Sequence, residues 1–147
     1  MRMQMRKRLA ANERGVVALE FVLVLPFLLI ILFGIIDTSL VLCDKAVITD
    51  AAGEAARAGV VLRTLPLNQS QIQSVALSYT QNNLVTGGTA TTPVVSVTPS
   101  GACASAGSGN PIQVAITYTY QGLVLGSALS SLTGPVTVTA IAVKNCE

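Results

Sequence analysis

The chain has 147 residues, enough for one small domain with an appended segment. Hydrophobic residues make up 51% of it, charged residues 11%, and the formal net charge is +2. After Arg63, only Lys144 and Glu147 carry charge. A long carboxyl-terminal part with so little charge and no basic patch argues against nucleic acid as a partner.

Residues 1–15 form a basic leader ahead of a long apolar run. The leader contains one acid, Glu13, and five basic residues, which are Arg2, Arg6, Lys7, Arg8 and Arg14. Basic residues beside an apolar run keep that flank of a membrane segment on the cytoplasmic side. We therefore expect a cytoplasmic leader and an extracytoplasmic carboxyl-terminal part.

Residues 16–36 are long enough to cross a membrane. As a helix, these 21 residues extend roughly 31 Å, close to the thickness of the hydrocarbon core. Residues 38–43 can extend the apolar segment, so the predicted transmembrane helix covers 16–42. Pro26 lacks an amide hydrogen and predicts a kink in this helix.

Other kinds of membrane segment explain the run less well. A cleaved secretory signal has a shorter apolar core followed by a small-x-small site, which residues 34–37 do not offer. A lipoprotein signal ending at Cys43 requires a small residue before the cysteine, and Leu42 is bulky. An ordinary signal anchor leaves Glu20, the one acid inside the run, without a purpose.

Glu20 acquires a purpose if the chain is cut between Gly15 and Val16. The cut gives Val16 an ammonium group with a pKa near 8. In a bundle of parallel helices, that ammonium can pair with Glu20 of a neighbouring subunit. The pair offsets part of the insertion cost of a buried charge, about 3 kcal/mol deep in a bilayer, and fixes the axial register. The alternative is an interfacial glutamate that extends to water from an ordinary anchor.

The basic leader, Gly15 at the membrane edge and Glu20 five residues later resemble the processing region of type IV pilin-like proteins. Residues 14–59 resemble the amino-terminal segment of the TadE-like family, which comprises pseudopilins or minor pilins of the tight-adherence (Tad/Flp) pilus machinery. The matching positions are Gly15, Ala18, Glu20, Phe21, Pro26, Leu28, Leu29, Gly34, Ala51, Ala52, Glu54, Ala55, Ala56, Arg57 and Gly59.

The resemblance implies a function and a location. It implies cleavage by the prepilin peptidase between Gly15 and Val16, followed by a role in pilus biogenesis. The implied partners are other pilin-like subunits of the pilus and its inner-membrane assembly platform. The implied location is the bacterial inner membrane, with a single crossing.

The first helix is expected to continue outside the membrane over residues 43–63. Ala51, Ala55 and Gly59 recur every four residues, a small-residue stripe that allows another element to approach closely. This element is either a neighbouring subunit or, as we favour, the chain's own sheet. The acids of this helix are expected at solvated positions, namely Asp37, Asp44, Asp50 and Glu54.

Residues 64–147 are predicted to form an α+β domain. A second, amphipathic helix is expected over 69–85, capped by Asn68 or Ser70. Alternating apolar residues predict three strands, at 93–98, 111–120 and 135–144, in an antiparallel sheet packed on the first helix. Residues 121–134 predict either a short helix over the sheet or an exposed contact surface.

Three cysteines lie on the extracytoplasmic side, where thiols oxidise. Cys103 lies in a Gly/Ala/Ser loop and Cys146 just past the last strand, so we expect a disulfide between them; two unpaired thiols are the alternative. Cys43 is expected to be unpaired within the chain, serving either as inert packing or as an intermolecular link.

Nothing in the sequence predicts an enzyme or a cofactor. There is no histidine, which excludes a Ser-His or Cys-His pair and a histidine metal site. No glycine-rich phosphate loop is present. Two interpretations remain: a processed pseudopilin, or a permanently anchored protein whose outer domain binds a partner in the envelope. The first residue of the mature protein distinguishes them.

Overall fold

The computed structural model describes residues 2–61, 65–87, 91–122 and 134–147, with side chains from Gly15 onward. The chain divides into two compact units, residues 1–36 and 37–147. Helix α1, Arg2–Val60, contributes to both units. The first unit consists of the amino-terminal part of α1, and all other described elements belong to the second.

Helix α1 ends three residues earlier than the sequence predicts. Its last residue is Val60 rather than Arg63, and residues 62–64 lie outside the described part of the chain. Gly59, Val60 and Val61 account for the early end, because glycine and β-branched residues both disfavour the helical conformation.

Helix α2, Gln69–Thr80, begins with a capping box. The Asn68 side chain accepts a hydrogen bond from the Gln71 amide at 2.9 Å, and the Gln71 side chain accepts one from the Asn68 amide at 3.0 Å. The helix ends five residues before the predicted Val85. At its end, the Asn83 side chain donates to the Tyr79 carbonyl at 2.7 Å, and such local bonds compete with further helical turns.

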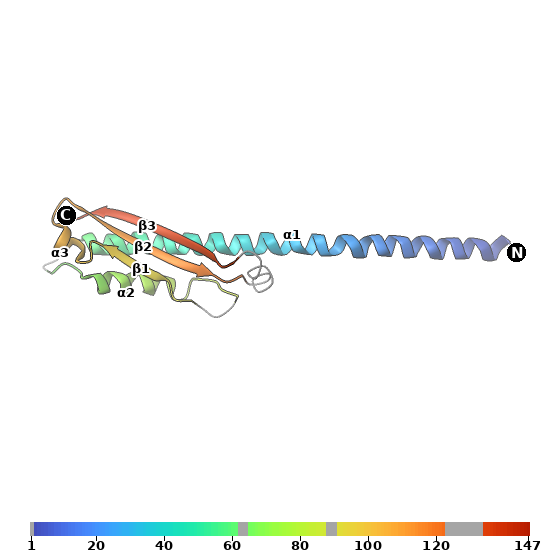
Figure 1. Cartoon of the computed structure of the whole chain (residues 1–147), viewed down its shortest axis with the longest axis horizontal. Helices are drawn as coiled ribbons and strands as arrows, with labels where there is room; N and C mark the ends of the chain where they lie inside the picture. Colours follow the sequence, from blue (N-terminus) through green and yellow to red (C-terminus); the bar gives the residue numbers. More distant parts are fainter. Residues whose placement is uncertain (1, 62–64, 88–90, 123–133) are drawn as a thin grey trace. The chain divides into compact units, whose positions relative to one another are not determined.

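The sheet has three antiparallel strands in the order β1-β2-β3. They are β1, Val94–Thr98; β2, Pro111–Tyr120; and β3, Val136–Asn145. In Figure 1 the sheet runs along the carboxyl-terminal part of α1, with α2 beside β1. This confirms the predicted α+β fold, a long helix packed on a three-stranded antiparallel sheet. A five-residue helix, α3 (Ala102–Ala106), was not predicted.

The core lies between α1 and one face of the sheet. From β2, alternate residues are buried, namely Ile112, Val114, Ile116, Tyr118 and Tyr120. From α1, the buried apolar residues are Ile48, Ala51, Ala52, Ala55 and Ala56. Because alanine side chains are short, the helix lies close to the sheet.

Gly59 extends this close contact toward the end of α1. A Cβ atom at Gly59 would lie 2.8 Å from Cδ1 of Ile112 and 2.9 Å from Cδ1 of Ile72. Ala51 and Ala55 are buried, and Gly59 lies close to side chains of β2 and α2.

Candidate functional site

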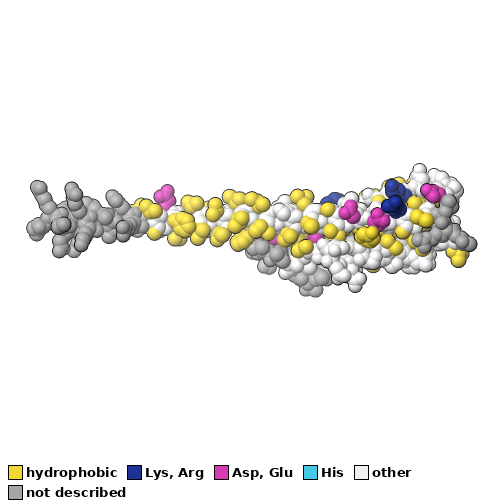
Figure 2. Space-filling view, turned by 180° about the vertical axis from the view of Figure 1, so that it is seen from behind, with side chains coloured by type: hydrophobic (Ala, Val, Ile, Leu, Met, Phe, Trp, Pro, Cys, Tyr) yellow, Lys and Arg dark blue, Asp and Glu magenta, His cyan; other side chains and the backbone are white. Residues whose placement is uncertain are grey.

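Among the described helices, α1 is long and apolar enough to cross a membrane. The candidate segment lies within residues 15–60. Most of its large side chains are exposed, and Figure 2 shows hydrophobic groups over the visible surface of this segment. Phe21 is 63% exposed and Phe27 71%. An exposed apolar helix of this length fits a single crossing of a membrane.

The predicted processing residues lie on α1, where the apolar surface begins. The backbone is helical through Gly15 and Val16, and Glu20 follows Val16 by about one turn. A Cβ atom added at Gly15 would meet nothing within 4 Å, so packing within the described residues does not require glycine there. The same holds for Gly34 and Gly53.

Glu20 is an exposed acid within an otherwise apolar surface. Among the side chains that the structure describes, none forms an ion pair with it. The described ion pair lies farther along α1, between Arg57 and Glu54, with 3.7 Å between Nη1 and Oε1. A positive charge that pairs with Glu20 would therefore come from outside the described side chains.

Pro26 lies within the helical part of α1. Its ring nitrogen cannot donate to the carbonyl of Val22, so one hydrogen bond of the helical ladder is missing at this point. The kink that we expect here remains a prediction.

The start of the second unit brings two acids of α1 against other elements. The hydroxyl of Tyr120, at the end of β2, donates to Oδ1 of Asp37 at 3.4 Å. The amide of Val85, between α2 and β1, donates to Oδ1 of Asp44 at 2.8 Å. Lys45 donates from Nζ to the carbonyl of Thr139 on β3.

The expectation that all four acids of this helix are solvated is wrong for Asp44. Its exposure is 0%, and burial raises the pKa of its carboxyl group, an effect that the hydrogen bond from Val85 partly offsets. The spacing contained a signal for this burial. Asp44 precedes the buried Ile48, Ala51 and Ala55 by four, seven and eleven residues, which places all four on one helical face.

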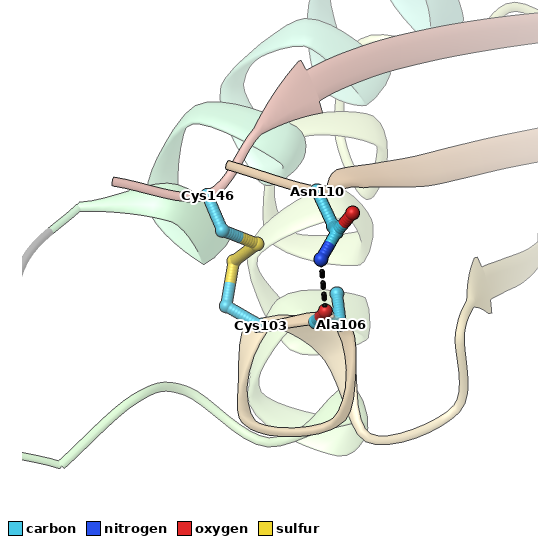
Figure 3. Close-up of a disulfide and its surroundings, with 4 residues drawn as sticks. All are labelled: Cys103, Ala106, Asn110 and Cys146. Atoms are coloured by element: carbon cyan, nitrogen blue, oxygen red, sulfur yellow. Dashed lines mark hydrogen bonds between the residues drawn. A yellow bond between two sulfur atoms is a disulfide. The ribbon is translucent and has the colours of Figure 1, made fainter. Parts of the chain in front are cut away.

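A disulfide joins α3 to the carboxyl-terminal end of the domain. Cys103 in α3 is bonded to Cys146, which follows β3, and their Cα atoms are 5.6 Å apart (Figure 3). The side chain of Asn110 donates to the carbonyl of Ala106 at 2.7 Å, as Figure 3 shows. The Cys146 amide also donates to the Asn110 carbonyl at 2.9 Å. These bonds fasten the carboxyl end to α3, while Cys43 is exposed and free.

No group of three or more His, Cys, Asp or Glu side chains that could hold a metal ion occurs within the described residues. The polar side chains described above bind backbone groups, each other or a tyrosine hydroxyl. This arrangement fastens elements together and offers no nucleophile beside a base.

Comparison with known proteins gives one result. Residues 15–57 match the family described as TadE-like protein. No curated protein and no solved structure matches the chain. The matched segment begins at Gly15, contains the apolar part of α1 and extends through the alanine-rich face that packs on the sheet. Over this segment the chain is similar to TadE-like proteins.

Proposed function

We propose that the protein is a pseudopilin or minor pilin that functions in the assembly of a Tad/Flp-type adhesive pilus. The observation that supports this most strongly is the family match, which begins at Gly15. It covers the predicted cleavage position, Glu20 and the whole apolar segment. In this proposal the chain lies in the bacterial inner membrane with residues 1–15 in the cytoplasm and residues 43–147 outside it.

Processing requires the prepilin peptidase to reach the backbone between Gly15 and Val16. The helix continues through these residues, so a turn must unwind before the peptide bond can be cleaved. Glycine lowers the cost of unwinding by about 1 kcal/mol relative to alanine. Because the described residues leave open space at Gly15, access to the backbone is a better reason for this glycine than packing.

Assembly then uses the charge of Glu20. After cleavage, Val16 carries an ammonium group about one turn from Glu20 on the same helix. Pairing within one chain does nothing to set the position of a neighbour. Pairing between chains relieves the cost of the buried carboxylate in one axial register and leaves that cost in every other.

The proposal predicts an assembly defect for Glu20→Gln in the native host. The amide keeps the hydrogen-bonding capacity but not the charge, so crosslinking to other pilin-like subunits should fall and pili should be reduced or lost. Membrane insertion and cleavage should persist, because neither depends on this carboxylate. Glu20→Ala should behave in the same way, with insertion unchanged or slightly easier.

The matched control is Glu54→Gln, on the same helix. Glu54 is a partly exposed acid whose partner is the exposed Arg57, and a surface pair of this kind contributes about 0–1 kcal/mol. This variant should assemble normally. Assembly of Glu20→Gln at the wild-type level would show that the charge-pairing account is wrong.

A further inference from the structure

The segment between α2 and β1 is fastened to α1 through a buried carboxyl group. Asp44 is fully buried, and one of its oxygens, Oδ1, accepts the Val85 amide. The other oxygen, Oδ2, is buried and has no hydrogen-bond partner among the described residues. Thr86, next to Val85, carries the other buried side-chain oxygen without a partner in the described part of the chain.

This contact belongs to a circuit of hydrogen bonds around the start of the second unit. The Gly87 amide donates to the Gln121 carbonyl at 2.9 Å, which joins the same segment to the end of β2. The hydroxyl of Tyr120 returns to α1 through Asp37. Residues 84–87 are thus held at one end by Asp44 and at the other by the residue that follows β2.

Burying the ionised form of the Asp44 carboxyl group costs more free energy than burying its neutral form. An ionised carboxylate that is buried with one oxygen unpaired loses most of its hydration, and a single backbone amide offsets only part of that loss. A neutral carboxyl group loses much less on burial. The closed arrangement therefore favours the neutral form.

We propose that Asp44 is a proton-sensitive latch, which holds residues 84–87 against α1 when its carboxyl group is neutral and favours their release when it is ionised. This inference is independent of the proposed role in pilus assembly. Residues 84–87 then have two states, held against α1 or released from it, and the populations of the two states depend on pH.

The ionisable groups around the latch are few. Asp37 lies two turns earlier on α1 and accepts a hydrogen bond from the Tyr120 hydroxyl. The ammonium group of Lys45 is bonded to the Thr139 carbonyl on β3. Residues 81–87 and 121–135 contain no ionisable side chain.

The sign of the pH dependence follows from the raised pKa of Asp44 in the closed arrangement. The closed state binds the proton more tightly than the open state, so acidification favours closing. The stabilisation is present at low pH. It is lost as the pH rises from the ordinary aspartate pKa of 3.8 through the raised value.

Hydrogen–deuterium exchange on the full-length protein in detergent micelles tests the latch. Exchange is measured at the Val85 amide and in peptides that cover residues 81–87. Protection at each pH is the exchange rate of an unstructured peptide divided by the measured rate, which removes the intrinsic effect of pH on exchange. As the pH is lowered toward the ordinary aspartate pKa of 3.8, protection should rise several-fold in the wild type. Asp44→Asn, a permanently neutral acceptor for the Val85 amide, should be protected at every pH.

Two further variants complete the design. Asp44→Ala removes the acceptor and should leave the Val85 amide weakly protected throughout the pH range. Asp50→Asn, at an exposed acid of the same helix, should retain the wild-type pH response. Wild-type protection that does not change with pH, or a pH response that survives in Asp44→Asn, would overturn the proposal.

Discussion

Glu20 and Asp44 show how the surroundings of a single residue decide what a carboxylate does. Both lie on α1, but Glu20 is exposed where the surrounding side chains are apolar, whereas Asp44 is buried against residues 84–87. The charge of Glu20 can be balanced only by something outside the described side chains, which suits a contact between subunits. Asp44 is partly balanced within the domain, which suits an internal latch.

Two glycines of α1 provide a matched pair at the residue scale. A Cβ atom at Gly53 meets nothing within 4 Å, whereas at Gly59 it would lie within 3.0 Å of the terminal carbons of Ile112 and Ile72. Alanine is favoured over glycine inside a helix by about 1 kcal/mol. Overpacking a core costs about 1–3 kcal/mol. The surroundings should therefore decide the sign of the same substitution.

We expect Gly53→Ala to raise the free energy of unfolding by up to about 1 kcal/mol. Gly59→Ala should lower it by about 1 kcal/mol, because the helix ends at Val60 and the gain in helix propensity there is small. Denaturant unfolding of the two full-length variants in detergent micelles measures the difference. Equal stabilisation by both substitutions would show that Gly59 is not tightly packed.

At the scale of elements, the spacing of apolar residues along the sequence predicts the helices and strands that local interactions determine. The apolar run of residues 16–36 predicted a helix, and the alternation in Ile112, Val114 and Ile116 predicted a strand with one buried face. Each pattern recurs with the period of the element itself, so no knowledge of distant contacts was needed.

Other features depend on contacts between residues far apart in sequence, and these were missed. Helix α2 stops at Thr80, before the segment whose Val85 amide is bonded to Asp44, 41 positions away. Asp44 itself was assigned to solvent because it is charged, although its spacing to Ile48 placed it on the core face. Most of the segment 121–134, which predicts either a short helix or an exposed contact surface, lies outside the described residues, namely 123–133.

The disulfide between α3 and the residue after β3 makes a prediction about elements. Its cysteines are 43 positions apart, and closing a ring of that size stabilises a fold by about 3–4 kcal/mol on the chain-entropy model. Cys103→Ser or Cys146→Ser should lower the free energy of unfolding by that amount, as measured by denaturant unfolding without reductant.

The control for this prediction is Cys43→Ser. Cys43 is exposed and free, so its substitution should change stability by no more than about 0.5 kcal/mol. Peptide mapping of the non-reduced protein should recover Cys103 linked to Cys146. Native protein in which both thiols react with an alkylating agent would rule the bond out.

At the scale of the whole molecule, the chain joins an apolar helical segment to a small α+β domain stabilised by its own core and a disulfide. Among the described residues of the domain, no group of three or more His, Cys, Asp or Glu side chains could hold a metal ion. The single long apolar helix fits a single-pass membrane protein, and the segment that contains it is similar to the TadE-like family.

The most direct test of the proposed function is the intact mass of the mature protein isolated from membranes of its own host. The account predicts the mass of a chain that begins at Val16, without residues 1–15. It also predicts that Gly15→Leu and Gly15→Val stay full length, because a side chain at this position obstructs the peptidase. A mature protein that retains Met1, or efficient processing of either variant, would contradict the account and favour a permanently anchored envelope protein.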